Sequence, residues 1–224
     1  MIIKSNIKDL LTELRGSNAK LVAVSKTQPV EKIKEAYDAG QRLFGENKAQ
    51  EMMTKHQTLP NDIEWHMIGH LQTNKVKYIA SFVSLIHSVD SMKLLVEIDK
   101  QGKKAARIIP CLLQVHIATE ETKFGFNPGE VTSLLASSAL ADLKNIEVHG
   151  LMGMATLTEN QEIIKSEFQS LRNLFNDLSA ISLASNTFMR ELSIGMSSDY
   201  KIAIQEGGTL VRIGTAIFGE RNYH

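Results

Sequence analysis

The stretch "LVAVSKTQP", residues 21–29, marks an abrupt change from apolar to polar sequence. Four apolar residues run directly into Ser25 and Lys26, and a turn is expected immediately after them. A short apolar run bounded by turn residues indicates a buried strand. A lysine at the end of such a strand is unusual, because an unpaired ammonium group is costly in apolar surroundings. Lys26 therefore needs either a chemical role or a charged partner.

The same pattern of a short apolar run followed by a helical segment recurs along the chain. Alternating strands and helices predict a parallel sheet with helical crossovers. About eight such units in 224 residues fit a (β/α)8 TIM barrel better than an open sheet. We therefore predict one domain, residues 1–224, with this α/β fold. The strands are expected at 20–26, 42–46, 63–69, 82–89, 111–117, 147–154, 191–196 and 209–214.

Two of the intervening segments carry helix-start signals. In "NPGEVTSLLASSAL" (127–140), Asn127 is placed as an N-cap and Glu130 completes a capping box. Thr158 and Gln161 have the same relation at the start of the helix expected after residue 158. The inner stripe of that second helix is expected to be Ile164, Phe168, Leu171, Phe175 and Leu178.

Composition excludes several classes of protein. Lysine plus arginine and aspartate plus glutamate each number 25, so no positive surplus points to nucleic acid or an anionic membrane. The one cysteine, Cys111, excludes an internal disulfide and favours a reducing compartment. Residues 1–16 show helical spacing rather than a signal peptide, and no run approaches a membrane span. These features predict a cytoplasmic protein.

Reactive residue types gather where the barrel prediction places the active face. In TIM barrels that face lies at the carboxyl ends of the strands. Desolvation there would lower the pKa of Lys26 and make its amine a nucleophile toward carbonyl groups. The alternative is a lysine that extends to the rim or pairs with a carboxylate such as Glu46. The other polar groups at predicted strand ends are Gly45–Asn47, His66–His70, His87–Asp90 and Arg212–Thr215.

Two turns in the last third of the chain predict a phosphate site. Ser197 follows "SIGM", and Gly214 and Thr215 follow "VRI" at a strand-to-helix turn. Glycine allows an anion to approach the backbone, and amides at a helix start point toward it. Barrels often bind phosphate with the loops after strands seven and eight. The alternatives are a plain N-cap for Ser197 and a plain turn for Gly214, and Asp199 opposes an anion unless it points away.

Arg212 is expected inside the barrel, since strand alternation places it on the same side as Leu210 and Gly214. A buried arginine needs a partner, which is either Glu46 or Asp90, or the ring nitrogen of a cofactor. A lysine that forms a Schiff base, an anchored phosphate and an arginine facing a pyridine ring together describe pyridoxal 5′-phosphate (PLP).

These residues lie in motifs that resemble the pyridoxal phosphate homeostasis protein family, whose fold is the barrel of the alanine racemase N-terminal domain. Two departures are visible: Lys48 stands where an aromatic residue is expected, and Gly208 where a serine is expected. The first affects the mouth of the site and the second the certainty of phosphate anchoring. The matching stretches are "VAVSKTQP", "FGENKAQE", "WHMIGHLQTNK", "HSVDS", "GLMGMA" and "GMSSDYKIAIQEGGTLVRIGTAIFGER".

The resemblance implies a role for each site residue. Lys26 would carry PLP as a Schiff base, Arg212 would face the pyridine nitrogen, and Asn47 would lie beside the ring. The phosphate would be held by Ser197, Gly214 and Thr215. No residue is assigned a catalytic role, and no metal is expected, because the histidines lack compact ligand spacing.

The resemblance also implies a function. The protein would buffer or deliver PLP and maintain vitamin B6 and amino-acid homeostasis, without established turnover, as a monomer with transient contacts to apo PLP enzymes. We expect this chain to lack the second domain that supplies a tyrosine base in alanine racemase. Two alternatives stay open: a racemase-like PLP enzyme with a histidine or Tyr200 as second base, and a Schiff-base aldolase without PLP. Lys123, in a loop expected over the mouth, is either a solvated lysine or a second amine for PLP.

Overall fold

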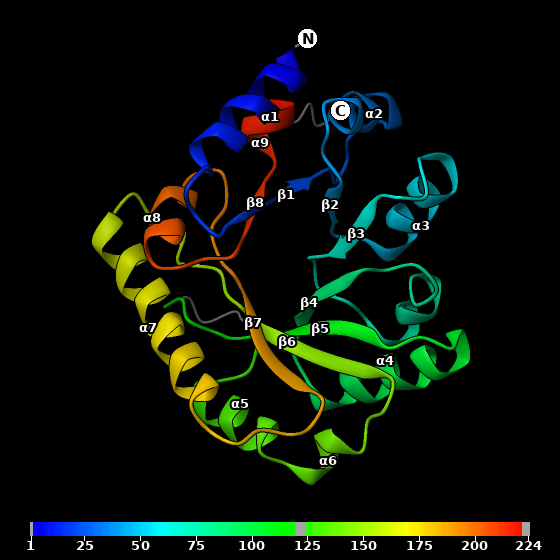
Figure 1. Cartoon of the computed structure of the whole chain (residues 1–224), viewed down its shortest axis with the longest axis vertical. Coiled ribbons are helices and arrows are strands. Elements are labelled where there is room, and N and C mark those ends of the chain that lie inside the picture. The colour runs from blue at the N-terminus through cyan, green and yellow to red at the C-terminus, as the bar shows by residue number, and fades with distance from the viewer. Residues whose placement is uncertain (1, 120–123, 221–224) are drawn as a thin grey trace.

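The computed structural model describes residues 2–119 and 124–220. Its strands form one closed parallel barrel in chain order, and the last strand pairs with the first (Figure 1). This confirms the predicted (β/α)8 barrel. The strands are β1 (Lys20–Val24), β2 (Leu43–Glu46), β3 (Glu64–Met67), β4 (Leu85–Val89), β5 (Ile109–Gln114), β6 (Ile146–Met152), β7 (Thr187–Ser193) and β8 (Leu210–Ile213).

Helices surround the barrel on its outside (Figure 1). In the described part of the chain, no helix is both long and apolar enough to cross a membrane. The helices are α1 (Ile2–Glu13), α2 (Val30–Asp38), α3 (Ala49–Thr58), the 3-10 helix η1 (Thr73–Tyr78), α4 (Met92–Ala105), α5 (Pro128–Leu135), α6 (Ser138–Ala141), α7 (Gln161–Ser179), α8 (Tyr200–Gln205) and α9 (Thr215–Phe218).

The helix starts agree with the sequence at α5 and differ at α7. Asn127 and Glu130 form both hydrogen bonds of the predicted capping box. The predicted cap at Thr158 is wrong, because Asn160 accepts the hydrogen bonds from the first-turn amides of α7. The Thr158 hydroxyl oxygen accepts from the Asn160 amide instead, so it shapes the approach to the helix. The predicted inner stripe of α7, from Ile164 to Leu178, is buried.

The strands also differ from their predicted limits. Five of them end two or three residues before the apolar runs do, because the last residues of those runs leave the sheet, whereas β2 and β4 end where predicted. β7 begins at Thr187 rather than at residue 191. Its early residues alternate poorly in polarity, and an irregular register between Val148 and Gly150 allows them to pair with β6. The register of this pair depends on that bulge, which the sequence pattern of β7 does not reveal.

The alternation along the strands creates two apolar layers. One side packs against the helices, where Phe44, Trp65 and Phe168 are fully buried. Burial of each such side chain contributes roughly 1.5–3 kcal/mol to folding. The other side fills the barrel interior with a smaller cluster: Val22, Leu85, Leu112, Met152 and Leu210. Buried polar side chains also lie in the strands, among them His66, His87, Ser193 and Arg212.

Candidate functional site

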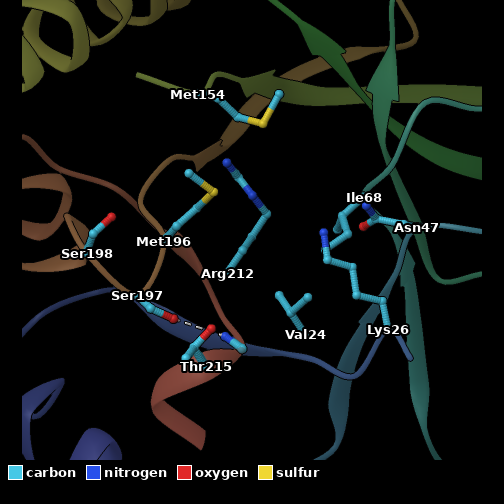
Figure 2. A pocket seen from close by; sticks show the side chains of 11 residues that line it. Val24, Lys26, Asn47, Ile68, Met154, Met196, Ser197, Ser198, Arg212 and Thr215 are labelled. Carbon is cyan, nitrogen blue, oxygen red and sulfur yellow. Dashed lines mark hydrogen bonds between the residues drawn. The ribbon is translucent and has the colours of Figure 1, made fainter. Parts of the chain in front are cut away.

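A cavity of about 340 Å³ opens at the carboxyl ends of the strands (Figure 2). This volume is within the usual range for small-molecule sites. All of the site residues predicted from the sequence lie on its wall: Lys26 after β1, Asn47 after β2, Ser197 after β7, and Arg212, Gly214 and Thr215 at the end of β8. The remaining lining residues are Val24, Ile68, Met154, Met196 and Ser198.

Lys26 is the second residue after the end of β1, and its side chain points into the cavity (Figure 2). Glu46, the carboxylate considered above as an ion-pair partner of Lys26, is fully buried and binds other groups. Lys55 Nζ lies 2.7 Å from Glu46 Oε1, and the Ser25 hydroxyl donates to the same oxygen over 2.6 Å. Burial raises the pKa of Glu46, and the adjacent Lys55 ammonium opposes part of that change.

Arg212 lies inside the barrel, as the strand alternation predicts, and its guanidinium points into the cavity (Figure 2). It donates to the Ser193 carbonyl over 2.8 Å, to the Ser193 hydroxyl over 2.5 Å and to the Gly153 carbonyl over 2.9 Å. These neutral acceptors fix the plane of the guanidinium without neutralising its charge. Arg212 therefore presents a positive charge to the cavity.

The carboxylates that the sequence offered as partners of Arg212 are engaged elsewhere. Glu46 binds Lys55, and Asp90 pairs with His70 over 3.0 Å. Burial lowers the pKa of Arg212 to about 10, and the Asp199 carboxylate opposes part of that change. The guanidinium remains protonated at neutral pH, since even this lowered pKa is well above 7.

A chain of buried hydrogen bonds leads from Arg212 across the barrel interior. His87 Nδ1 lies 2.8 Å from the Ser193 hydroxyl oxygen, and His87 Nε2 lies 2.9 Å from His66 Nδ1. Arginine can only donate, so the Ser193 hydroxyl that accepts from it is free to donate its own hydrogen to His87 Nδ1. The His87 tautomer with its hydrogen on Nε2 accepts this bond and donates to His66, whereas the other tautomer reverses both bonds. In either case Arg212 is the end of the chain that only donates.

The two buried histidines predict a loss of stability in acid. Burial lowers the pKa of His66 from 6.5 to about 3, assisted by Lys20. Burial, followed by the nearby His66 and Arg212, holds the pKa of His87 well below 6.5. Both residues bind protons more readily in the unfolded chain, so their contribution is fully present above pH about 6.5 and declines as pH falls toward 3.

We expect the free energy of unfolding to fall by at most roughly 3 kcal/mol per histidine between pH 7 and pH 4. Denaturant titrations at several pH values measure this slope. A matched titration of the His66→Gln, His87→Gln double variant should give a shallower dependence. Nitrogen-15 shifts that show either ring protonated in the folded protein at pH 5 would contradict the assignment.

The turns after β7 and β8 meet at one side of the cavity. The Gly214 amide donates to the Ser197 hydroxyl oxygen over 3.3 Å, and α9 begins at Thr215. The plain N-cap interpretation of Ser197 is wrong, because α8 begins at Tyr200 with Asp199 at the cap position. The Asp199 carboxylate accepts from the Met196 amide and is not on the cavity wall. It therefore turns back into its own loop.

The residues considered above as the second base of a racemase-like enzyme do not line the cavity. The Tyr200 hydroxyl donates to Glu13 over 2.7 Å, on the side of α8 that faces α1. His66 belongs to the buried chain, and His70 pairs with Asp90 and stacks on Phe124 with ring centroids 4.0 Å apart. Residues 2–119 and 124–220 hold no cluster of three or more potential metal ligands. Lys123 lies outside the described residues.

Comparison with known proteins gives a consistent family. The sequence-family model for the alanine racemase N-terminal domain matches residues 2–222. The pyridoxal phosphate homeostasis protein of Aquifex aeolicus is 44% identical over 211 residues, which cover 93% of this chain and 90% of that protein.

Solved structures agree with the sequence matches. PipY of Synechococcus elongatus, solved without PLP, is 35% identical with a TM-score of 0.89, over 97% of this chain and all of that one. The PLP-bound form of PipY is 34% identical with a TM-score of 0.86 over the same share of each chain. Alanine racemase of Clostridium difficile shares the fold, with a TM-score of 0.77 at 14% identity, over 99% of this chain and 57% of that one. This chain belongs to the pyridoxal phosphate homeostasis protein family, which has the barrel of the alanine racemase N-terminal domain.

Proposed function

We propose that this protein binds PLP in the cavity at the carboxyl ends of its strands and holds it for release to other proteins. One observation carries the proposal: an amine, a guanidinium and a cluster of hydroxyl and amide donors converge on a single cavity of about 340 Å³. An amine suits an aldehyde, donors suit a phosphate, and a fixed cation suits an unprotonated pyridine nitrogen. The site therefore offers a partner to the aldehyde, the phosphate and the pyridine nitrogen of PLP.

The phosphate would lie between the turns after β7 and β8. Thr215 offers a backbone amide at the start of α9 and Ser197 a hydroxyl on the facing turn, and the Gly214 amide, which donates to the Ser197 hydroxyl oxygen, would turn to the anion. The site is narrow here, because a Cβ added to Gly214 would lie 3.2 Å from the Val24 carbonyl oxygen. A backbone without a side chain lets an anion approach closely. We assign phosphate retention to these three residues.

Lys26 would hold the cofactor covalently. Bound PLP supplies an aldehyde that bonds reversibly to amines and a pyridine ring that can accept electrons. Lys26, whose side chain reaches into the cavity, is the residue that would supply the amine for this aldehyde, with water as the by-product. A second amine would be able to displace Lys26 and return it to its free form. Exchange of one amine for another makes the storage reversible.

Arg212 and Asn47 would act on the ring. A guanidinium that already donates to Ser193 and Gly153 offers the pyridine nitrogen only a hydrogen, so that nitrogen stays unprotonated. An unprotonated ring is a weaker electron sink, which suits a carrier more than a catalyst. Asn47, on the cavity wall after β2, would lie beside the ring.

The positions of the residues considered as a second catalytic base further support a carrier role. Tyr200, His66 and His70 are absent from the cavity wall, and the curated relatives are named for homeostasis rather than for a reaction. The proposal includes maintenance of vitamin B6 and amino-acid pools through transient contacts with apo PLP enzymes. Action in the cytoplasm as a monomer stays a prediction from the sequence.

The test compares delivery with turnover. The protein loaded with PLP should reactivate an apo PLP enzyme, and the Lys26→Ala variant, loaded in the same way, should do so poorly. The loaded protein should show no racemase, decarboxylase or transaminase turnover across a panel of amino acids. Steady turnover on the order of 1 per second that Lys26→Ala abolishes would make it an enzyme and overturn the proposal.

A further inference from the structure

The backbone of Lys26 is held from both sides by side chains that do not line the cavity. On one side, the Ser25 hydroxyl donates to Glu46 Oε1 over 2.6 Å, and the Ser25 carbonyl accepts from Lys55 Nζ over 2.8 Å. On the other side, the Thr27 amide donates to Glu51 Oε1 over 2.6 Å. Both neighbours of Lys26 are therefore anchored to β2 and α3.

Lys55 joins these anchors into one network. Its ammonium donates to the Ser25 carbonyl, to Glu46 Oε1 over 2.7 Å and to Glu51 Oε1 over 2.7 Å, which uses its three hydrogens. The Lys55 side chain is 7% exposed and that of Glu46 is fully buried. Buried ion pairs add little net stability, because desolvation offsets much of the attraction. A contribution to folding stability therefore does not by itself explain why this buried network is present.

The turn that contains Lys26 also needs support. The Gln28 amide donates to the Ser25 carbonyl over 3.0 Å, which places Lys26 and Thr27 at the centre of the turn. Thr27 has a φ of +64°, a left-handed conformation that is uncommon for a β-branched residue. Such strain persists only where the surroundings hold it in place, and it is concentrated at functional sites. The bond from Thr27 to Glu51 is one of those supports.

We propose that Glu46, Glu51 and Lys55, here called the Lys55 clamp, position Lys26 so that its amine reaches the aldehyde of PLP. This inference rests on the proposed function. The three residues are positioning residues, since they hold the strand end and the turn but do not line the cavity. Lys26, between the two anchored residues, extends its side chain into the cavity (Figure 2). Glu51 and Lys55 lie one turn apart on α3, so this helix carries the clamp to the end of β1.

The test separates positioning of the amine from general damage to the site. It compares the affinity for PLP with the affinity for 4-deoxypyridoxine 5′-phosphate, which has a methyl group in place of the aldehyde. Glu51→Ala frees the Thr27 amide at a partly exposed position, so this variant should fold. Its PLP affinity should fall at least about tenfold, the equivalent of one charge-assisted hydrogen bond, and its affinity for the deoxy compound should change less than about twofold.

Two further variants complete the design. The quantity compared is the ratio of the affinity for PLP to the affinity for the deoxy compound. Lys55→Met should lower this ratio more than Glu51→Ala does, provided that the variant folds. Glu51→Gln should keep most of the wild-type ratio, because an amide oxygen can still accept from the Thr27 amide. Arg107→Met is a matched control: it removes bonds to the Ala80 and Val83 carbonyls at the opposite end of the barrel and should leave the ratio unchanged.

The outcomes are distinguishable. A ratio that stays at the wild-type value in Glu51→Ala would overturn the clamp while leaving the proposed function intact. An equal loss of affinity for both ligands would also overturn it, because the network would then only stabilise the site. A wild-type protein that binds neither ligand would overturn the proposed function and, with it, this inference.

Discussion

Replacement of Lys26 by alanine is expected to abolish covalent attachment of PLP while leaving weak, reversible binding. In the wild-type protein, borohydride should reduce the C=N bond and fix a pyridoxyl group on the peptide that contains Lys26. The variant keeps Ser197, Gly214 and Arg212, the proposed partners of the phosphate and the ring, but has no amine at the proposed aldehyde position. Its visible absorption should therefore resemble that of free PLP. Mass spectrometry of the digested protein locates the label.

A surface lysine provides the control for this experiment. Lys34 pairs with Asp38 on the exposed face of α2, away from the cavity wall, so Lys34→Ala should keep the label and the absorption of the wild type. A label found on another peptide, or an unchanged absorption band in Lys26→Ala, would show that a different amine holds the cofactor.

Pyridoxal, which lacks the phosphate, is expected to bind at least about 100-fold more weakly than PLP. Each hydrogen bond to a charged group contributes roughly 1.5–3 kcal/mol, and the Ser197 hydroxyl and the Thr215 amide border the proposed phosphate position, in addition to the Gly214 amide that donates to Ser197. Two such bonds already correspond to about 100-fold in affinity. Titrations of the apo-protein with the two compounds, followed by absorption or calorimetry, measure the difference.

Ser197→Ala gives this prediction an internal control. The variant should bind PLP roughly 10- to 100-fold more weakly, and its affinity for pyridoxal should remain that of the wild type, because only PLP presents a phosphate. Equal affinity of the wild-type protein for pyridoxal and PLP would contradict the assignment of these turns. A Ser197→Ala variant that loses affinity for both compounds equally would place Ser197 elsewhere in the site.

The sequence was sufficient to predict the fold and the polar residues Lys26, Asn47, Ser197, Arg212, Gly214 and Thr215 of the cavity wall for one physical reason. Parallel barrels bring the carboxyl ends of all strands to one face, so residues as distant as Lys26 and Arg212 converge once the strands are recognised. Strand alternation likewise placed Arg212 inside. Their roles toward PLP stay predictions that the variants above test.

Other features depend on packing that the pattern of residues does not reveal. Glu51 and Lys55 have the spacing of an ordinary surface pair on a helix, and only the packing of α3 beside β2 and the turn after β1 buries Lys55. His66, His87 and Ser193 meet inside the barrel from separate strands. Met154 and Met196 line the cavity, although apolar residues near strand ends are typical of the core. Each case depends on contacts between elements that are distant in the sequence.

The buried chain from Arg212 through Ser193 to His87 and His66 has a consequence for proton traffic at the site. A proton relay needs a final member that can accept a proton, and every hydrogen-bond donor along it must be able to reverse. Here the chain ends at Arg212, and a guanidinium with all its hydrogens has no lone pair to offer. The interior of the barrel is therefore a dead end for protons coming from the side of His66. A cofactor held against Arg212 would be insulated from acid on that side and exchange protons only through the open mouth of the cavity.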